Sequence, residues 1–360
     1  MSQLFIIKLK KVIIIVLFCF LAGAYFALVE TVFMSSTIPH GYNEHGPLFV
    51  FLAQCLAGII GGGFFAVLDI FFLRRRFRHK SLGQAIVLEA LIFIILFLII
   101  TLFVNIAYIL YYTDYNLLSD QAVNVMLNYF KNSGFYLNFL NWMIVLVMVL
   151  VFLQVGDKFG EGAFMKFFLG KYHKPKEEMR VFMFLDIKNS TGIAEKLGHA
   201  RYFKLLKDFY SDVTYPILRT RGEIYQYVGD EITINWHLNT ALENSNCIKC
   251  FFDIREMVES RREYYTDKYG VSPEFKAGIH FGLVTVGEVG IIKREIVYSG
   301  DLLNTTARIM EECRTQNRDF LISKDLSDSL EQDHNFNISH IGAIELRGKQ
   351  QKIDLLSITT

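Results

Sequence analysis

The chain has 360 residues, of which 52% are hydrophobic and 20% are charged. It is too apolar for one soluble domain and too charged for a protein that lies wholly in a membrane. The net charge of +1 gives no indication of a nucleic-acid partner, and we expect none.

Residues 1–155 are predicted to form a transmembrane domain of four helices. Four apolar runs reach the roughly 20 residues that a helix needs to cross a bilayer. They are approximately 12–34, 49–73, 85–111 and 137–155. The first run is longer than the apolar core of a usual signal peptide and has no clear cleavage site, so we expect it to be a retained helix in contact with membrane lipid.

The loops predict the orientation of these helices. Basic residues precede the first run and fill the turn between the second and third: Lys8, Lys10, Lys11, Arg74, Arg75, Arg76, Arg78 and Lys80. The other two loops, 35–48 and 112–136, contain a single basic residue, Lys131. Because basic loops stay in the cytoplasm, we expect both termini and the soluble part on the cytoplasmic side of the plasma (inner) membrane.

Two features of the predicted helices have alternative interpretations. Gly58 and Gly62 give the second run a small-residue face, which favours ordinary packing within the chain over a dimer interface. Asp69 and Glu89 are costly in lipid and indicate either a functional site or a structural ion pair with the basic turn nearby.

Residues 156–179 form a strongly charged segment with phenylalanines at near-helical spacing. This pattern predicts an amphipathic juxtamembrane linker helix that ends near Pro175. It serves either to transmit a signal or only as an interfacial anchor. The soluble domain is expected over residues 180–360.

Strand and helix patterns alternate in this soluble domain, which predicts an α+β or α/β fold. The expected elements are a strand at 180–187, helix 193–220 with a break at Gly198, hairpin 223–236, helix 242–269, strand 275–288, helix 301–314 and a strand pair within 340–360. The five cysteines are scattered, so no disulfides are expected, and Cys247 and Cys250 are interpreted as buried helix residues.

Asp186 and Asp230 each follow a short apolar strand and precede a polar turn. A strand that ends in this way places a carboxylate at the edge of a sheet. Two such carboxylates suit a divalent ion held over a phosphate group.

Five motifs in residues 180–358 resemble, in order, those of the catalytic domain of class III nucleotidyl cyclases. They are Phe184-Leu-Asp-Ile-Lys-Asn-Ser-Thr191, Val228-Gly-Asp230, Ala277-Gly-Ile-His-Phe-Gly282, Tyr298-Ser-Gly-Asp-Leu-Leu-Asn-Thr-Thr-Ala-Arg308 and Leu346-Arg-Gly-Lys349. The whole chain resembles the general plan of membrane-bound bacterial cyclases. The resemblance implies a ferredoxin-like βαββαβ core and conversion of ATP to cyclic AMP and pyrophosphate.

The resemblance also implies roles for individual residues. Asp186, Asp230 and the carbonyl of Ile187 would hold two Mg²⁺ or Mn²⁺ ions. The family pattern gives Asn304 the task of orienting the ribose and Arg308 that of stabilising transition-state charge. The residues that would bind the triphosphate are Lys188, Asn189, Ser190, Thr191 and Lys349, the first four in a turn where Ser190 and Thr191 take helix-capping positions.

Two implications of the resemblance concern the base and the assembly. The base-reading positions hold Gln226 and Val297, where adenine-specific relatives carry lysine and often Asp or Thr, and guanine-specific relatives usually carry Glu at the first position. We favour adenine; a guanylate cyclase and a catalytically silent cyclase-like module are the alternatives. Because the family builds each site from two catalytic domains, the resemblance implies a head-to-tail homodimer.

Overall fold

The computed structural model describes residues 3–37, 47–77, 80–112, 119–159, 163–330, 336–345 and 352–359. The chain divides into two compact units, one formed by Phe5–Lys158 and the other mainly by Phe159–Thr360. Each unit is described by itself.

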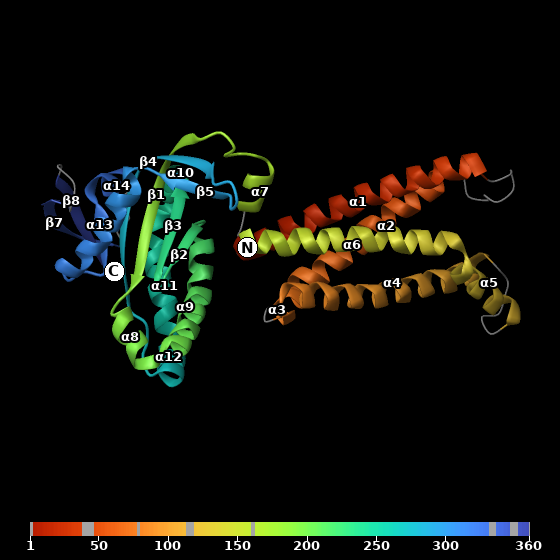
Figure 1. Ribbon diagram of the computed structural model, residues 1–360, viewed down its shortest axis with the longest axis horizontal. Helices are drawn as coiled ribbons and strands as arrows, with labels where there is room; N and C mark the ends of the chain where they lie inside the picture. The colour runs from red at the N-terminus through yellow and green to blue at the C-terminus, as the bar shows by residue number, and fades with distance from the viewer. Residues whose placement is uncertain are drawn as a thin grey trace. The chain divides into compact units, whose positions relative to one another are not determined.

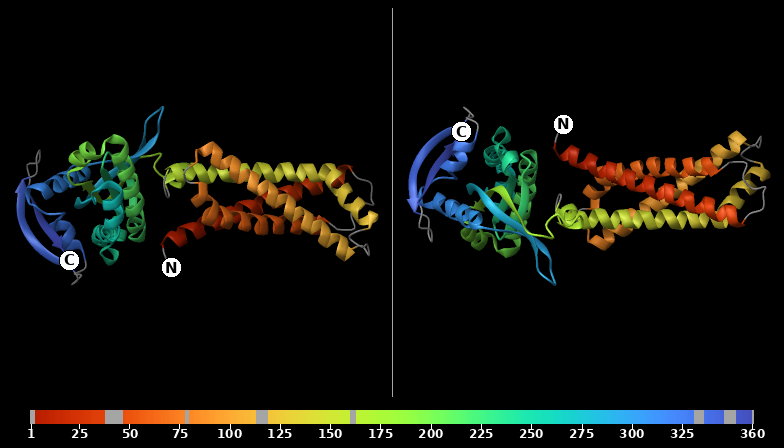
Figure 2. Two further views of the ribbon diagram at one scale, coloured as in Figure 1. Left: turned by 90° about the horizontal axis from the view of Figure 1, so that it is seen from below. Right: turned by 90° about the horizontal axis from the view of Figure 1, so that it is seen from above.

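The first unit is helical (Figures 1 and 2). Its elements are α1 (Gln3–Thr37), α2 (Pro47–Leu68), the π-helical turn η1 (Asp69–Leu73), α3 (Arg74–Phe77), α4 (Leu82–Tyr112), α5 (Asp120–Lys131) and α6 (Ser133–Phe159). Four segments are long and apolar enough to cross a membrane: Phe5–Val29, Gln54–Leu73, Leu82–Phe103 and Ser133–Gly156. The four predicted spans are therefore confirmed as helices, with ends shifted by several residues.

Helices α1 and α2 approach each other closely through glycines. A Cβ atom on Gly58 would lie 2.4 Å from the carbonyl oxygen of Cys19, and one on Gly62 would lie 2.6 Å from the Cys19 Cβ. Only hydrogen at these positions allows such contact, as is usual for helices that pack in lipid. The prediction that Gly58 and Gly62 serve packing within the chain is confirmed.

The carboxyl groups predicted near the basic turn are buried and paired. Asp69 is fully buried at the start of η1 and accepts a hydrogen bond of 2.7 Å from Nε of Arg74. Glu89 accepts one of 3.2 Å from Nε2 of Gln154 on α6. The structural ion pair is thus confirmed for Asp69, and a charge paired in this way is far less costly in lipid than an isolated one.

The second unit contains an eight-stranded sheet with helices on both faces. Its elements are α7 (Ala163–Phe168), β1 (Lys176–Ile187), α8 (Ser190–Leu197), α9 (His199–Arg219), β2 (Glu223–Val228), β3 (Glu231–His237), α10 (Leu238–Leu242), η2 (Glu243–Ser245), α11 (Asn246–Ser260), α12 (Arg262–Tyr269), β4 (Phe275–Val289), β5 (Glu295–Ser299), α13 (Asp301–Thr315), β6 (Phe320–Ser323), α14 (Lys324–Ser329), β7 (Asn337–Glu345) and β8 (Lys352–Thr359).

The strand order confirms the expected βαββαβ core. Strands β4, β1, β3 and β2 are neighbours in that order, all antiparallel, and β6, β8 and β7 extend the sheet beyond β4. Figure 1 shows α9 and α11 on one face of the sheet and α13 on the other. The larger apolar core lies under α9 and α11, and a smaller one lies under α13.

Several boundaries differ from those predicted. Strand β1 begins at Lys176, so the expected linker of residues 156–179 contains the end of α6, the short helix α7 and the first residues of β1. The expected helix 242–269 is broken twice: Asn244 and Ser245 have positive φ before α11 begins, and Arg261, with a φ of −106°, ends α11. Strands β5 and β6 were not expected, because a five-residue and a four-residue run are too short to show a period.

A network of charges around the buried Arg180 secures the beginning of β1. The fully buried Arg180 donates to Oε2 of Glu178 at 2.6 Å and lies 3.5 Å from Glu223, which in turn pairs with Lys166 of α7 at 2.7 Å. The hydroxyl of Tyr172 also donates to Glu178, at 3.1 Å. Helix α7 and the residues after it are thereby attached to the sheet, which explains why the strand starts before the predicted boundary.

Helix α13 lies directly on β4 because Gly278 has no side chain. A Cβ there would meet the backbone nitrogen of Met310 at 2.3 Å and its Cα at 2.7 Å. We expect Gly278→Ala to reduce the free energy of unfolding by at least about 2 kcal/mol, since backbone atoms must move apart. Urea unfolding of the full chain in detergent, followed by Trp236 fluorescence in a Trp142→Phe background, measures this.

The matched control is Gly282→Ala, on the same strand under the same helix. A Cβ at Gly282 would meet the nearest atom, the Cβ of Leu302, at 3.6 Å, which is ordinary contact. This variant should change stability by less than about 1 kcal/mol. Equal losses in the two variants would contradict the close approach at Gly278.

Candidate active site

Asp186 lies near the end of the central strand β1. Its strand neighbours Phe182 and Phe184 belong to the apolar cluster under α13, and because side chains alternate along a strand, Asp186 faces the same side. The side chain is 23% exposed. The carboxyl group is therefore placed at the rim of a packed apolar surface, within reach of solvent.

Asp230 lies in the two-residue turn between β2 and β3. Gly229, which precedes it, has a φ of +64°, and its carbonyl accepts a hydrogen bond of 2.6 Å from the hydroxyl of Tyr210 on α9. The register pairs Asp186 with Glu231, so the turn brings Asp230 beside Asp186. The two carboxyl groups approach closely enough to share a hydrogen bond. The pair predicted from the sequence thus comes together at one edge of the sheet.

The surroundings of Asp186 oppose its ionisation. Burial raises the pKa of its carboxyl group to about 6, and the hydrogen bond and charge of Asp230 add to this effect. Lys276, whose Nζ lies 3.4 Å from Oδ2 of Asp186, acts in the opposite direction. Burial and the charge of Asp186 also raise the pKa of Glu231. The site is a group of carboxyls with excess negative charge.

This donor set fits a magnesium-like ion. Such ions prefer oxygen ligands and are commonly held by one or two carboxylates together with the phosphates of a substrate. In the described part of the chain, His, Cys, Asp and Glu side chains form no group of three or more that could hold a metal ion. Asp186 and Asp230 supply two carboxyl groups, fewer than the four protein ligands that a closed structural zinc site has.

The predicted phosphate-binding turn follows β1 directly, with one correction. Helix α8 begins at Ser190, and its N-cap is Asn189, which has a φ of +51° and makes no side-chain capping bond. Ser190 and Thr191 are therefore the first residues of the helix rather than its caps. The ammonium group of Lys188 forms an ion pair with Asp319 and lies 3.8 Å from Glu274. Ser190 lies near Tyr202 of α9.

Asn304 and Arg308 lie on α13, where Asn304 is exposed and the Arg308 side chain is 35% exposed. Among the described residues, Arg308 pairs with Glu311 at 2.6 Å, one turn further along the helix, and not with either aspartate. The structure of one chain therefore does not gather these two residues with Asp186 and Asp230.

The two proposed base-reading positions lie on different strands. Gln226 is exposed on β2, and Val297 lies on β5 opposite Gly287. Their neighbours Tyr225 and Tyr298 meet with ring centroids 5.0 Å apart. The segments that carry Gln226 and Val297 are therefore adjacent in space. Lys349 lies outside the described residues.

Sequence reasoning missed three residues that shape the site. They are Lys276 beside Asp186, Tyr210 under the turn of Asp230, and Glu231 opposite Asp186. The sequence did contain a signal for Lys276, because this residue directly precedes the Ala277-Gly278 motif on a neighbouring strand. Tyr210 had none, since its contact with Gly229 spans 19 positions and depends on how α9 packs.

Comparisons with known proteins concern mainly the second unit. The family described as "Adenylate and Guanylate cyclase catalytic domain" matches residues 172–357. "Adenylate cyclase 2" of Rhizobium meliloti (strain 1021) is 37% identical over 211 residues, which are 59% of this chain and 58% of that protein. The chain thus spans little more than half the length of this curated relative.

Solved cyclase structures are also similar to part of the chain, at low sequence identity. A bacterial light-regulated adenylyl cyclase has a TM-score of 0.47 and 18% identity over 52% of each chain. The adenylyl cyclase CyaB from P. aeruginosa has a TM-score of 0.46 and 17% identity, over 52% of this chain and 96% of that chain.

The raised pKa of Asp186 predicts a pH-dependent gain in stability from Asp186→Asn when no metal is bound. The pKa rises from 3.8 to about 6, so the folded protein bears an increasing cost of ionisation as the pH rises through this range, and the full cost above it. Asparagine removes that cost. In EDTA, the melting temperature of the variant should exceed that of the wild type above pH 6, and the difference should vanish below about pH 4.

Asp253→Asn is the control, because Asp253 pairs with Arg219 on the surface of the helices that cover the opposite face. It should not gain stability above pH 6. A gain from Asp186→Asn that is the same at every pH would show that the ionised carboxylate is not under strain.

Proposed function

The chain belongs to the adenylate and guanylate cyclase catalytic domain family, which matches residues 172–357, and on this premise we propose that it is a membrane-anchored adenylate cyclase. It would convert ATP to 3′,5′-cyclic AMP and pyrophosphate. The observation that carries the proposal is the Asp186–Asp230 pair, at the end of the central strand of the family's core. The 37% identity to a protein named adenylate cyclase supports adenine as the base.

Asp186, Asp230 and the carbonyl of Ile187 would hold two divalent ions, Mg²⁺ or Mn²⁺. When bound, these ions lower the pKa of the attacking 3′-hydroxyl and neutralise charge on the triphosphate. The protein's own contribution is a group of carboxyls that Lys276 only partly neutralises, with a turn that Tyr210 holds in place. The raised pKa of Asp186 means that a cation relieves an unfavourable ionised state there.

The remaining functional groups would act on the nucleotide. Asn304 orients the ribose, and Arg308 stabilises the charge that develops on the α-phosphate, for which a permanently charged, planar donor is suited. The residues proposed for the triphosphate are Lys188, Asn189, Ser190, Thr191 and Lys349. Lys188 would first have to leave Asp319 and Glu274.

The active form would be a head-to-tail homodimer. On α13 Asn304 is exposed and Arg308 is partly exposed, so both can reach the site of a second chain. The β4–β5 hairpin projects beyond the sheet (Figure 2), and the side chains of Ile291 and Ile292 near its tip are fully exposed. Exposed apolar side chains of this kind are typical of contact surfaces.

We place the cyclase unit on the cytoplasmic side of the plasma (inner) membrane, with both termini there. The support is the distribution of basic residues around the four apolar helices. In this arrangement residues 1–155 form the membrane domain, and the segment around α7 connects it to the catalytic domain. ATP is available in the same compartment.

A guanylate cyclase is the second candidate, because Gln226 stands where adenine-specific relatives carry lysine. Glutamine carries both a donor and an acceptor, so it can pair with either purine. Purified full-length protein incubated with ATP or GTP and Mg²⁺ or Mn²⁺, with the products identified by mass spectrometry, separates the two candidates. A folded protein that forms neither product would be the silent module.

The dimer predicts complementation between two inactive variants. Asp186→Asn and Arg308→Ala should each lower cyclase activity at least about a hundredfold, since the first removes an ion ligand and the second a charge-stabilising group. In 1:1 mixtures allowed to exchange subunits, half of the dimers are mixed and hold one intact site. Activity should therefore recover to about a quarter of the wild-type value.

Asp253→Asn mixed with Arg308→Ala is the control, because Asp253 lies outside the site and its variant should be active by itself. If the mixture of Asp186→Asn and Arg308→Ala instead exchanged subunits and recovered no activity, that result would place Asp186 and Asp230 in the same chain's site as Asn304 and Arg308.

Base selection is tested by opposite substitutions at one position. Gln226→Lys should raise the ratio of ATP to GTP turnover, and Gln226→Glu should lower it, each by about tenfold. The reason is that lysine keeps only the donor of glutamine, whereas glutamate keeps only the acceptor. Competition assays with both nucleotides present measure the ratio. Equal ratios in the wild type and both variants would show that Gln226 does not contact the base.

A further inference from the structure

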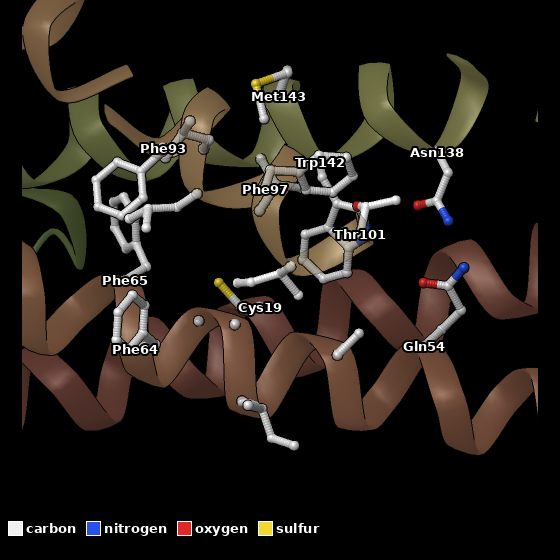
Figure 3. A pocket seen from close by; sticks show the side chains of 18 of the residues that line it. Cys19, Gln54, Phe64, Phe65, Phe93, Phe97, Thr101, Asn138, Trp142 and Met143 are labelled. Atoms are coloured by element: carbon white, nitrogen blue, oxygen red, sulfur yellow. The ribbon is translucent and has the colours of Figure 1, made fainter. Parts of the chain in front are cut away.

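The membrane unit contains a cavity that cyclase chemistry does not use. Its volume is about 570 Å³, and it is lined by residues of α1, α2, α4, α5 and α6 (Figure 3). Ligand-binding cavities of proteins commonly have volumes of about 300–1,000 Å³. Its size lies within this range.

The lining of the cavity is polar at one end and apolar at the other. The carboxamides of Gln54 and Asn138 face each other at one end, with Thr101 near them, and the rings of Phe65 and Phe93 lie at the opposite end (Figure 3). None of the described residues that line the cavity is charged. A molecule that matches it therefore has an uncharged polar head and an apolar body.

We propose that this cavity binds a neutral single-chain amphiphile, with a hydroxyl or carbonyl head between Gln54 and Asn138 and its chain among the phenylalanines. A carboxamide offers both donors and an acceptor, so the pair can bind either head group. A charged head would lose its hydration without gaining an opposite charge, which is costly in an apolar unit. The site goes beyond the proposed cyclase activity and does not depend on it.

The position of the cavity in the chain connects it to the second unit. Helix α6 supplies Asn138 and Trp142 to the lining, and it is the last helix before α7 and β1. A bound amphiphile would contact the helix that leads directly into the cyclase unit.

Two glycines allow a matched pair of variants. Gly61 lines the cavity, and a Cβ there would meet no atom within 4 Å, so Gly61→Leu places a side chain in the cavity with no clash at its Cβ. Gly83, near the start of α4, has equally open space but does not line the cavity. Both changes favour helix formation to a similar degree, so they differ mainly in the cavity. Gly62 is unsuitable because of its contact with Cys19.

Trp142 provides an intrinsic probe of occupancy, since it lines the cavity and bromine quenches tryptophan on contact. The other tryptophan, Trp236, is 1% exposed in the core of the second unit, and a Trp142→Phe variant measures its constant signal. The full-length protein, in phosphatidylcholine bilayers, is titrated with a long-chain 1-alkanol that carries bromine at mid-chain. A brominated fatty acid of equal length, ionised at pH 9, is the charged comparison.

In the wild type and in Gly83→Leu, the alkanol should quench Trp142 with saturation, and unbrominated alkanol should reverse the quenching. Gly61→Leu should lose the saturable part. Asn138→Leu, which removes a head-group partner, should weaken binding by about tenfold, and the ionised fatty acid should bind the wild type at least about tenfold more weakly than the alkanol. If a variant does not fold, the wild type alone still tests the proposal, because displacement by unbrominated alkanol must restore its Trp142 fluorescence.

Three results would overturn the proposal. The first is quenching that rises with dose in the same unsaturated way in all variants. The second is saturable binding of the fatty acid as tight as that of the alkanol. The third is quenching of Trp142 by brominated phosphatidylcholine in the bilayer that Gly61→Leu abolishes, because a phospholipid chain would then be the occupant.

Discussion

The alternation of side chains along β1 is the constraint on which the cyclase unit depends. Val181, Met183 and Leu185 enter the core under α9 and α11, while Phe182 and Phe184 enter the core under α13. Both faces of this strand are filled before the chain reaches Asp186. A shift of one residue in its register would exchange the two sets of apolar side chains and turn the carboxyl of Asp186 toward the core under α9 and α11. The position of the proposed ion site is therefore specified by hydrophobic packing.

The proposed site is held in an electrostatically unfavourable state. Two carboxyls share a hydrogen bond at a half-buried edge, and Lys276 offsets only part of their charge. The aromatic ring of Tyr210 packs against Tyr227 with centroids 4.5 Å apart, and its hydroxyl holds the turn of Asp230. These contacts of Tyr210 support the turn that carries Asp230.

The membrane unit uses one glycine-rich stretch of α2 in two ways. Gly58 and Gly62 allow α2 to approach α1 closely, and Gly61 and Gly62 both line the cavity. Close packing against α1 and open space at Gly61 both result from the absence of side chains. The cavity could not be inferred from the glycines alone, because its other walls come from α4, α5 and α6.

The amino-acid sequence by itself determined the four apolar helices, the break at Gly198 and the order of the longer strands and helices, because these follow from local composition and periodicity. It also predicted Asp186 and Asp230 as partners, since each follows an apolar strand. Only the tertiary structure decided that β1 begins at Lys176, that Lys276 and Tyr210 support the site, and that Asp186 resists ionisation. These features depend on strand register, on burial and on contacts between residues far apart in the chain, none of which a local pattern contains.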